Sequence, residues 1–493
     1  MSRDIQVNPI FMDHMIVQRE VEVPIWGTGT EDGTLVTVKC RGVQVETTIE
    51  AGSWKVLLPP MLAGGPEELV IETNNDTIVL KDILFGDVWL AGGQSNMEFP
   101  LKDTTDAEEE IATANLPDVR FYNVPKVAFE DGAKQRSSWK VCTPKSAGQL
   151  SGVGYHYAKQ LVASQDIPIG IISCNWGGTS ASCWMSEQVL LEDSELRIYI
   201  DEYNAQMKEF DWEAFEVADR EYDRLSVDYH RRLAKGLQGE ELGEHPWPPP
   251  LSPRSFLRPS GLYETMLRKV APYAIKGFLY YQGESDAHRP VLYERLLRSL
   301  IDNWRRDWNN VNLPFLNVQL PAYSNGDRPD DDEWPLLRES QTIVSERVSD
   351  TGLVVTLDCG EYDDIHPKNK KPVGERLALV ALERVYGVTV ESSGPVFSEL
   401  NIEEGKVIVS FSHVGDGLAS RDIELIGFEV GDEQGNYITA HATIRGNQVE
   451  LWNQQIAQPV AVRYGWANYT EANLINSFGL PAGPFRTNRE GRA

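Results

Sequence analysis

Apolar runs that end in glycine and then in polar residues constrain the fold of this chain most strongly. Residues 83–91 lead into a Gly-Gly pair and Ser95, and the runs at 171–174 and 277–281 end in similar segments. Apolar runs of this length, bounded by turn residues, are typical of buried strands. Glycine permits a tight turn with positive φ, which can lift a following serine clear of a sheet edge. Ser95 is therefore a candidate nucleophile, although a plain turn that closes the strand has the same pattern.

A candidate base lies far downstream. Asp363 precedes His366 by three residues, on a segment before a predicted helix. An aspartate can orient an imidazole, which can then accept a proton from a hydroxyl group. The spacing favours Asp363 for this role, with Asp364 as the alternative. The glycine pair at 177–178 and the amide of Gln282 follow the other two apolar runs and are candidate donors to an oxyanion.

Four segments carry these residues in specific motifs. They read Gly-Gln-Ser-Asn-Met-Glu at 93–98, Asn-Trp-Gly-Gly-Thr at 175–179, Tyr-Gln-Gly-Glu-Ser at 281–285 and Asp-Asp-Ile-His-Pro at 363–367. Together they resemble the carbohydrate-esterase branch of the SGNH hydrolase superfamily, which is typified by sialate O-acetylesterases. The resemblance covers about residues 5–390. The wider superfamily usually has an asparagine where this chain has Gln282.

The resemblance implies a serine esterase that removes acetyl groups from sugars without a metal or another cofactor. Ser95 would attack the ester, His366 would transfer the proton, and Asp363 would hold the imidazole. The backbone N–H groups of Ser95 and Gly178, with the Gln282 side chain, would bind the oxyanion. The predicted substrate-binding residues are Asn96, Trp176, Glu284 and Arg258.

The pattern along the chain predicts three regions. Residues 1–80 contain short strands separated by turns, which predicts an N-terminal β-sandwich. Strands alternate with helices in residues 81–390, which indicates an α/β domain with a parallel sheet, and the resemblance implies an SGNH-hydrolase-like three-layer arrangement. Residues 391–493 again contain only short strands and predict a C-terminal β-sandwich domain.

An insertion at about residues 190–257 interrupts the strand–helix alternation. Apolar residues recur there at helical spacing in two stretches, and a proline-rich connector follows at 246–250. We expect a helical hairpin or a long broken helix that packs one face on the body. Proline makes the connector stiff and extended. It is either a spacer or a wall over the active site, with Trp247 or Phe256 touching the substrate.

Composition limits the partners of this chain. The net charge of −28 disfavours nucleic acid and anionic membranes, because like charges repel at long range. The absence of a run of about 20 apolar residues predicts no transmembrane helix. The N-terminal segment lacks the apolar core of a signal peptide, which predicts a cytoplasmic protein, or a secreted one if a leader has been removed. The five scattered cysteines predict free buried thiols.

The expected partner is an acetylated mono- or oligosaccharide, and a homo-oligomer is left open. The negative charge favours neutral acetylated sugars, such as xylo-oligosaccharides, whereas the family resemblance favours O-acetylated sialic acids. A sialic acid carboxylate would need a local cation, for which Arg258 is the candidate. Two other classes remain open at this point: a non-catalytic carbohydrate-binding protein with a degenerate hydrolase core, and a lipase-like enzyme for longer acyl chains.

Overall fold

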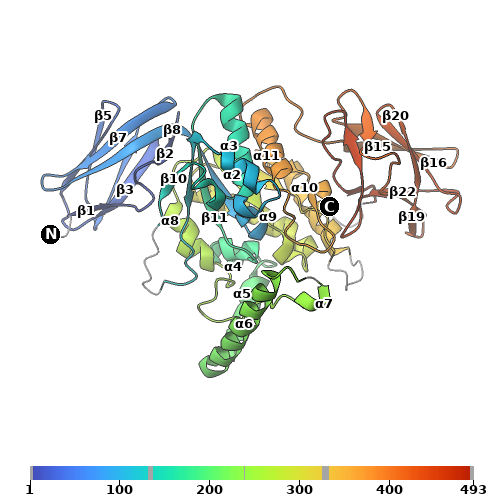
Figure 1. The fold of residues 1–493 in the computed structure, drawn as a ribbon, viewed down its shortest axis with the longest axis horizontal. Helices are drawn as coiled ribbons and strands as arrows, with labels where there is room; N and C mark the ends of the chain where they lie inside the picture. Colours follow the sequence, from blue (N-terminus) through green and yellow to red (C-terminus); the bar gives the residue numbers. More distant parts are fainter. Residues whose placement is uncertain (1–3, 131–136, 238, 325–331, 489–493) are drawn as a thin grey trace.

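The computed structural model describes the chain except for residues 1–3, 131–136, 238, 325–331 and 489–493, and it has an α/β region between two β regions (Figure 1). The N-terminal β region contains two sheets. One consists of β1 (Ile5–Val7), β3 (Val23–Gly29) and β6 (Ser53–Leu58). The other contains β2 (Ile16–Gln18), β4 (Leu35–Cys40), β5 (Val43–Thr48), β7 (Gly64–Glu72) and the first part of β8 (Thr77–Gly93). Burial alternates along β4 and β6, as expected where one face of a strand covers a core.

Strand β8 joins the N-terminal region to the central one. Its first part pairs with β7, and its last part lies between two strands of the central sheet. All residues from Ile83 to Gly93 are buried. The predicted boundary at residue 80 therefore falls within one continuous strand, and the Gly-Gly turn follows a strand that is anchored in both regions.

The central sheet positions the functional segments. Its order is β10 (Trp139–Cys142), β9 (Leu116–Asn123), β11 (Ile169–Asn175), β8, β12 (Gly277–Tyr281), β13 (Phe315–Val318) and β14 (Thr351–Val354). From β9 to β14 the neighbouring strands are parallel, and β10 is antiparallel at the edge. Every residue of β11, β12 and β13 is buried, as is typical of parallel strands covered on both faces. The carboxyl ends of these strands therefore meet at one edge.

Helices cover both faces of this sheet. Trp89 of β8 packs edge-on against Tyr157, with ring centroids 5.4 Å apart. Gly92 makes room for Trp304, because a Cβ at this position would lie 2.6 Å from the indole ring. Residues 89 and 92 point to opposite faces of a strand, so the helices that carry Tyr157 and Trp304 lie on opposite sides. The helices of the two layers are α3 (Gly152–Gln165), which packs on α11 (Lys371–Arg384), and α9 (Pro290–Asp307), which packs on α10 (Glu333–Arg347).

The insertion contains the expected helices, which are α5 (Arg197–Lys208), α6 (Trp212–Leu233) and the short α7 (Gly239–Leu242). Helix α5 buries Tyr199 and Ile200. The prediction that both helices pack on the body is wrong for α6, which extends away from it (Figure 1) and has no buried residue. Charged residues occupy most of its circumference, so it gains little from burial. In the described ranges, no helix combines the length and apolarity needed to cross a membrane.

The C-terminal region has its own hydrophobic core, which also includes Ala322 and Leu357 of the central region. Short strands are formed there, as predicted for the region, and they belong to small sheets. They are β15 (Val396–Glu403), β16 (Lys406–Ser412), β17 (Leu418–Ser420), β18 (Phe428–Gly431), β19 (Tyr437–Thr439), β20 (His441–Arg445), β21 (Gln448–Trp452), β22 (Ala461–Tyr464), β23 (Leu474–Asn476) and β24 (Phe485–Arg486). All five cysteines of the chain are buried and free, as expected.

Candidate active site

Ser95 occupies the first position of the short helix α1 (Ser95–Glu98), and only Gln94 separates it from the end of β8. The turn requires a glycine at position 93, where φ is 132°. A side chain there would place its Cβ 2.1 Å from the carbonyl oxygen of Tyr281. Gln94 N–H donates to the same carbonyl oxygen at 3.0 Å and fixes the turn to β12. N–H groups in the first helical turn have no partner inside the helix. The N–H group of Ser95 is therefore available to an oxyanion.

The second glycine segment lies against Ser95. A Cβ on Gly177 would lie 3.2 Å from Ser95 Cβ, and Gly178 has φ of 73°, in the left-handed region. The N–H group of Gly177 donates to Glu98 Oε2 at 2.7 Å. This bond occupies the first glycine N–H group and leaves Gly178 as the candidate donor. The structure thus brings the predicted Ser95 and Gly178 segments together, and it adds Glu98, which the sequence did not single out.

The segment that carries His366 is joined to the residue after Ser95. Asn96 Nδ2 donates to the carbonyl oxygen of Ile365 at 3.0 Å. Burial is the main influence on the His366 imidazole and lowers its pKa, while the charge of Asp364 acts in the opposite direction. A lowered pKa keeps the imidazole neutral at neutral pH, which is the form that a general base requires.

The two candidate carboxylates differ in their surroundings. The Asp363 side chain is exposed. Asp364 Oδ1 accepts a hydrogen bond from the backbone N–H of His366 at 2.8 Å. Among the described residues, neither carboxylate is hydrogen-bonded to the imidazole ring. The role of Asp363 stays a prediction, and Asp364 is the carboxylate whose charge acts on the imidazole pKa in this arrangement.

Gln282 is not free to donate to an oxyanion. It is fully buried, and its Nε2 donates to Asp286 Oδ2 at 2.7 Å and to the Thr179 carbonyl at 3.2 Å. Its Oε1 accepts from the Tyr293 hydroxyl at 2.9 Å. Both amide protons are therefore engaged, which corrects the predicted role. Gln282 instead fixes the chain between β12 and the glycine segment.

A buried polar network involves Asn96, the residue after Ser95. Asn96 Nδ2 donates to Glu284 Oε1 at 2.5 Å, and Lys370 Nζ donates to Asn96 Oδ1 at 2.5 Å. Asn96 and Lys370 are fully buried, so the prediction that Asn96 contacts substrate is corrected to a structural role. Burial raises the pKa of Glu284 and lowers that of Lys370 to about 7. Lys370 was missed because a single lysine after His366 carries no sequence signal of burial.

Two aromatic residues of the insertion, Trp247 and Phe256, pack on the glycine segment and on Trp176 just before it. Trp176 and Phe256 stack with ring centroids 4.7 Å apart, and Lys126 Nζ lies 5.2 Å from the Trp176 ring centroid. A Cβ on Gly178 would lie 2.1 Å from the Trp247 ring, so this indole rests on the Gly178 backbone. The connector is therefore a wall beside the candidate oxyanion donor. The remaining predicted residue, Arg258, has its guanidinium 5.7 Å from the ring centroid of Phe129.

One group among the described residues has the donor types of a metal site. Ligand atoms of Asp106, Glu110 and His156 lie within 4.8 Å of one another. However, Lys159 Nζ donates to Glu110 Oε2 at 2.5 Å, and Lys371 Nζ lies 3.6 Å from Glu110 Oε1. Both Glu110 oxygens are thus already paired with ammonium groups, so we assign no metal to this group.

Comparison with known proteins places the chain among esterases that act on carbohydrates. A family model described as carbohydrate esterase, sialic acid-specific acetylesterase, matches residues 247–383. More narrowly, the chain belongs to the carbohydrate acetylesterase family. A carbohydrate acetylesterase from Xanthomonas citri has a similar structure, with a TM-score of 0.80 and 32% identity over 98% of this chain and 100% of that chain. Sialate O-acetylesterases of Mus musculus and Homo sapiens are each 26% identical over 96% of this chain, and the alignments cover 92% and 90% of those proteins.

Proposed function

We propose that this protein removes O-acetyl groups from sugars by a serine acyl-enzyme mechanism, on an SGNH-type catalytic domain. Ser95 Oγ attacks the acetyl carbonyl while His366 accepts its proton. The tetrahedral intermediate then collapses, and His366 donates the proton to the departing sugar oxygen. Water, activated by the same imidazole, attacks the acetyl-enzyme, and acetate leaves as Ser95 regains its proton.

The observation that carries this proposal is the junction at Asn96. This residue follows Ser95 directly, and its side chain holds the carbonyl of Ile365, which directly precedes His366. Both segments are therefore fixed to one buried group. This favours a stable separation between a nucleophile and its base, as acyl transfer requires.

The N–H groups of Ser95 and Gly178 are the proposed oxyanion donors. Ser95 N–H lies at a helix start, and the Gly178 segment packs on Ser95. Each such donor typically contributes about 3 kcal/mol to transition-state stabilisation. Asp363 is kept as the proposed partner of the imidazole, since catalytic hydrogen bonds are often long or misaligned before substrate binds. Asp364 is the alternative.

We propose neutral acetylated sugars with short acyl groups as the preferred substrates, such as acetylated xylo-oligosaccharides. The net charge of −28 opposes anionic substrates. Lys126 lies near Trp176 but is paired with Glu98, and the Arg258 guanidinium lies over Phe129. O-acetylated sialic acids are the alternative, favoured by the named activity of the mammalian relatives.

Hydrolysis of an aryl acetate and of acetylated xylo-oligosaccharide by the wild type tests the proposal. Turnover of both, without loss in EDTA, is expected, because the proposed steps use only protein side chains. Activity that is lost in EDTA and restored by a divalent metal would instead indicate a metal-dependent deacetylase. A protein that binds the oligosaccharide without hydrolysing either ester would be a carbohydrate-binding protein.

A further inference from the structure

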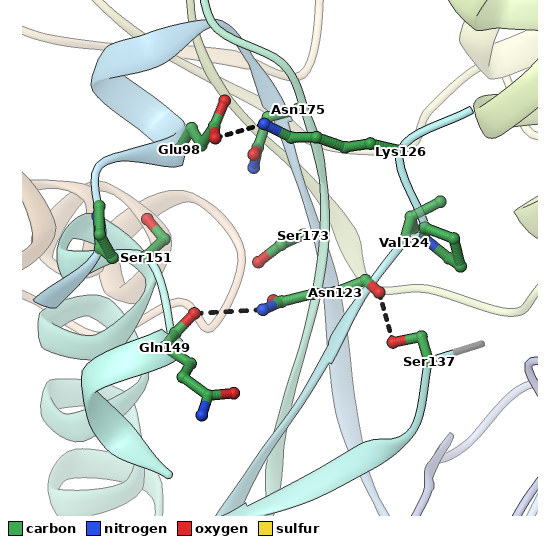
Figure 2. Close-up of a pocket in the computed structure, with 11 residues that line it drawn as sticks. Glu98, Asn123, Val124, Lys126, Ser137, Gln149, Ser151, Ser173 and Asn175 are labelled. Carbon is green, nitrogen blue, oxygen red and sulfur yellow. Dashed lines mark hydrogen bonds and ion pairs between the residues drawn. The ribbon is translucent and has the colours of Figure 1, made fainter. Parts of the chain in front are cut away.

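A cavity of about 350 Å³ lies beside the nucleophile segment, at the carboxyl ends of β9 and β11 (Figure 2). Its lining includes Glu98 of α1, Asn123 at the end of β9, and Ser173 and Asn175 of β11. Its volume lies at the small end of the roughly 300–1,000 Å³ range of ligand pockets. It is therefore large enough for a small polar ligand.

One wall of the cavity is shared with the catalytic segments. Glu98 lies three residues after Ser95, and its Oε2 accepts the N–H of Gly177, the glycine that packs on Ser95. The other Glu98 oxygen is paired with Lys126, which reaches across the cavity in Figure 2. A ligand in this cavity would thus lie beside an ion pair whose carboxylate is bonded to the glycine that packs on Ser95.

Two buried polar atoms at the cavity have no protein partner in the described part of the chain. They are Ser173 Oγ and Asn123 Oδ1, and Ser173 is only 8% exposed. The amide of Asn123 already donates to the Gln149 carbonyl at 3.1 Å, so only its acceptor oxygen is unused. Buried polar atoms are costly unless a water molecule or a ligand satisfies them. A hydroxyl group can both donate to the Asn123 oxygen and accept from the Ser173 hydroxyl.

The charge of the cavity indicates an uncharged ligand. Among the described residues that line it, Glu98 and Lys126 are the charged ones, and they neutralise each other. The remaining polar lining consists of serine, asparagine and glutamine side chains. A carboxylate placed here would find no unpaired cation, whereas neutral hydroxyl groups match the donors and acceptors present.

We propose that this cavity binds an uncharged sugar unit of the substrate, next to the sugar whose acetyl ester meets Ser95. The proposal rests on the proposed function and specifies its substrate as a neutral oligosaccharide. Ser173 and Asn123 would bind hydroxyl groups of this second unit. The second unit would contribute to binding of oligosaccharide esters and not to binding of a small aryl acetate.

Ser173→Ala and Ser173→Val test the proposal, with Ser164→Ala as the matched control on the exposed face of α3. For Ser173→Ala, kcat/KM on acetylated xylo-oligosaccharide should fall about five- to tenfold, chiefly through KM, as for one lost hydrogen bond. Ser173→Val should lose more, because its methyl groups also occupy the cavity. Turnover of 4-nitrophenyl acetate should be unchanged in both, and Ser164→Ala should equal the wild type on both substrates.

Unchanged kinetics on the oligosaccharide, or equal losses on both esters, would overturn the cavity assignment. A second measurement does not depend on the folding of Ser173→Val. The affinity for deacetylated xylo-oligosaccharide is measured by calorimetric titration of Ser95→Ala and of Ser95→Ala/Ser173→Ala. Weaker binding to the double variant is expected, and equal binding would refute the proposal. Tighter binding of sialic acid than of xylo-oligosaccharide would refute an uncharged ligand. Failure of the proposed function has a different signature, since Ser95→Ala would then still hydrolyse the aryl acetate.

Discussion

Asn96 donates a hydrogen bond to the Ile365 carbonyl at 3.0 Å and thereby connects the turn that carries Ser95 to the segment that carries His366. The Asn96 carboxamide is also bonded to Glu284 and Lys370, so its amide groups have protein partners. A buried and fully partnered group of this kind fixes geometry. The proposed nucleophile and base are therefore held by the same residue, although 271 positions separate them in the sequence.

Replacing the proposed nucleophile or base should abolish hydrolysis without unfolding the protein. The turn depends on Gly93, and not on the Ser95 hydroxyl, so Ser95→Ala should retain the wild-type melting temperature. Ser95→Ala and His366→Ala should each lower kcat on an aryl acetate on the order of 10⁴-fold or more, and the double variant should be little worse. Near wild-type turnover by folded Ser95→Ala would refute the assignment.

The pH dependence of kcat/KM should reflect the surroundings of His366. The neutral imidazole is the proposed base, so activity should rise with pH through an apparent pKa below 6.5, because burial lowers the His366 pKa. Asp364 acts in the opposite direction, so Asp364→Asn should move the rise to still lower pH. The measurement is kcat/KM on an aryl acetate from pH 4.5 to 9. A rise that moves to higher pH in Asp364→Asn would contradict this account.

The identity of the orienting carboxylate can be tested by comparing two amide variants. If Asp363 orients the imidazole, Asp363→Asn should lower kcat on the order of 10⁴-fold, as when a triad aspartate becomes an amide. Asp364→Asn should cost much less, because an amide oxygen can still accept the His366 backbone N–H. Large loss in Asp364→Asn, with nearly full activity in Asp363→Asn, would assign the role to Asp364.

Lys370 should make stability depend on pH. Burial lowers its pKa to about 7 from 10.5. Between these values the unfolded chain binds a proton that the folded protein does not, so this group makes the free energy of unfolding rise with pH. The measurement is urea unfolding at pH 7, 8 and 9. The free energy of unfolding should rise more steeply with pH for the wild type than for Lys370→Met. Lys368→Met, at an exposed position of the same segment, should follow the wild type; parallel curves for all three would show that Lys370 stays charged.

The buried strands that end in glycine and polar residues could be predicted, because apolar runs and glycine positions are local properties of the sequence. The apolar run at 171–174 lies within β11, and the run at 277–281 is β12. Apolar runs of this length leave few alternatives once helices separate them. The meeting of the Ser95 and Gly178 segments at one edge then follows from parallel pairing of β8 and β11.

Side-chain partners could not be predicted in the same way. Gln282 has the position of an oxyanion donor, yet Asp286 and Tyr293 engage its amide, and these contacts depend on how the following helix packs. The burial of Lys370 likewise depends on Asn96, which is 274 residues away. Helix α6 has apolar periodicity but projects from the body, because periodicity identifies an apolar face without identifying what covers it.

The last prediction concerns charge selectivity. Glu98 pairs with Lys126, and its Oε2 accepts the Gly177 N–H. A glutamine at this position keeps an oxygen acceptor for Gly177 but removes the charge that neutralises Lys126. The freed ammonium group should favour a substrate carboxylate, since a hydrogen bond to a charged group is worth roughly 1.5–3 kcal/mol.

In Glu98→Gln, the ratio of kcat/KM on 9-O-acetylated sialic acid to that on acetylated xylo-oligosaccharide should rise about tenfold or more, in line with that energy. The ratio also corrects for any general loss of activity caused by a displaced Gly177. Arg258→Ala is the comparison variant. The Arg258 guanidinium lies over Phe129, so its removal should leave the ratio unchanged. The opposite outcome is a wild type that strongly prefers the sialic acid, with this preference lost in Arg258→Ala and unaltered in Glu98→Gln. That outcome would assign carboxylate binding to Arg258 and reject neutral sugars as the preferred substrates.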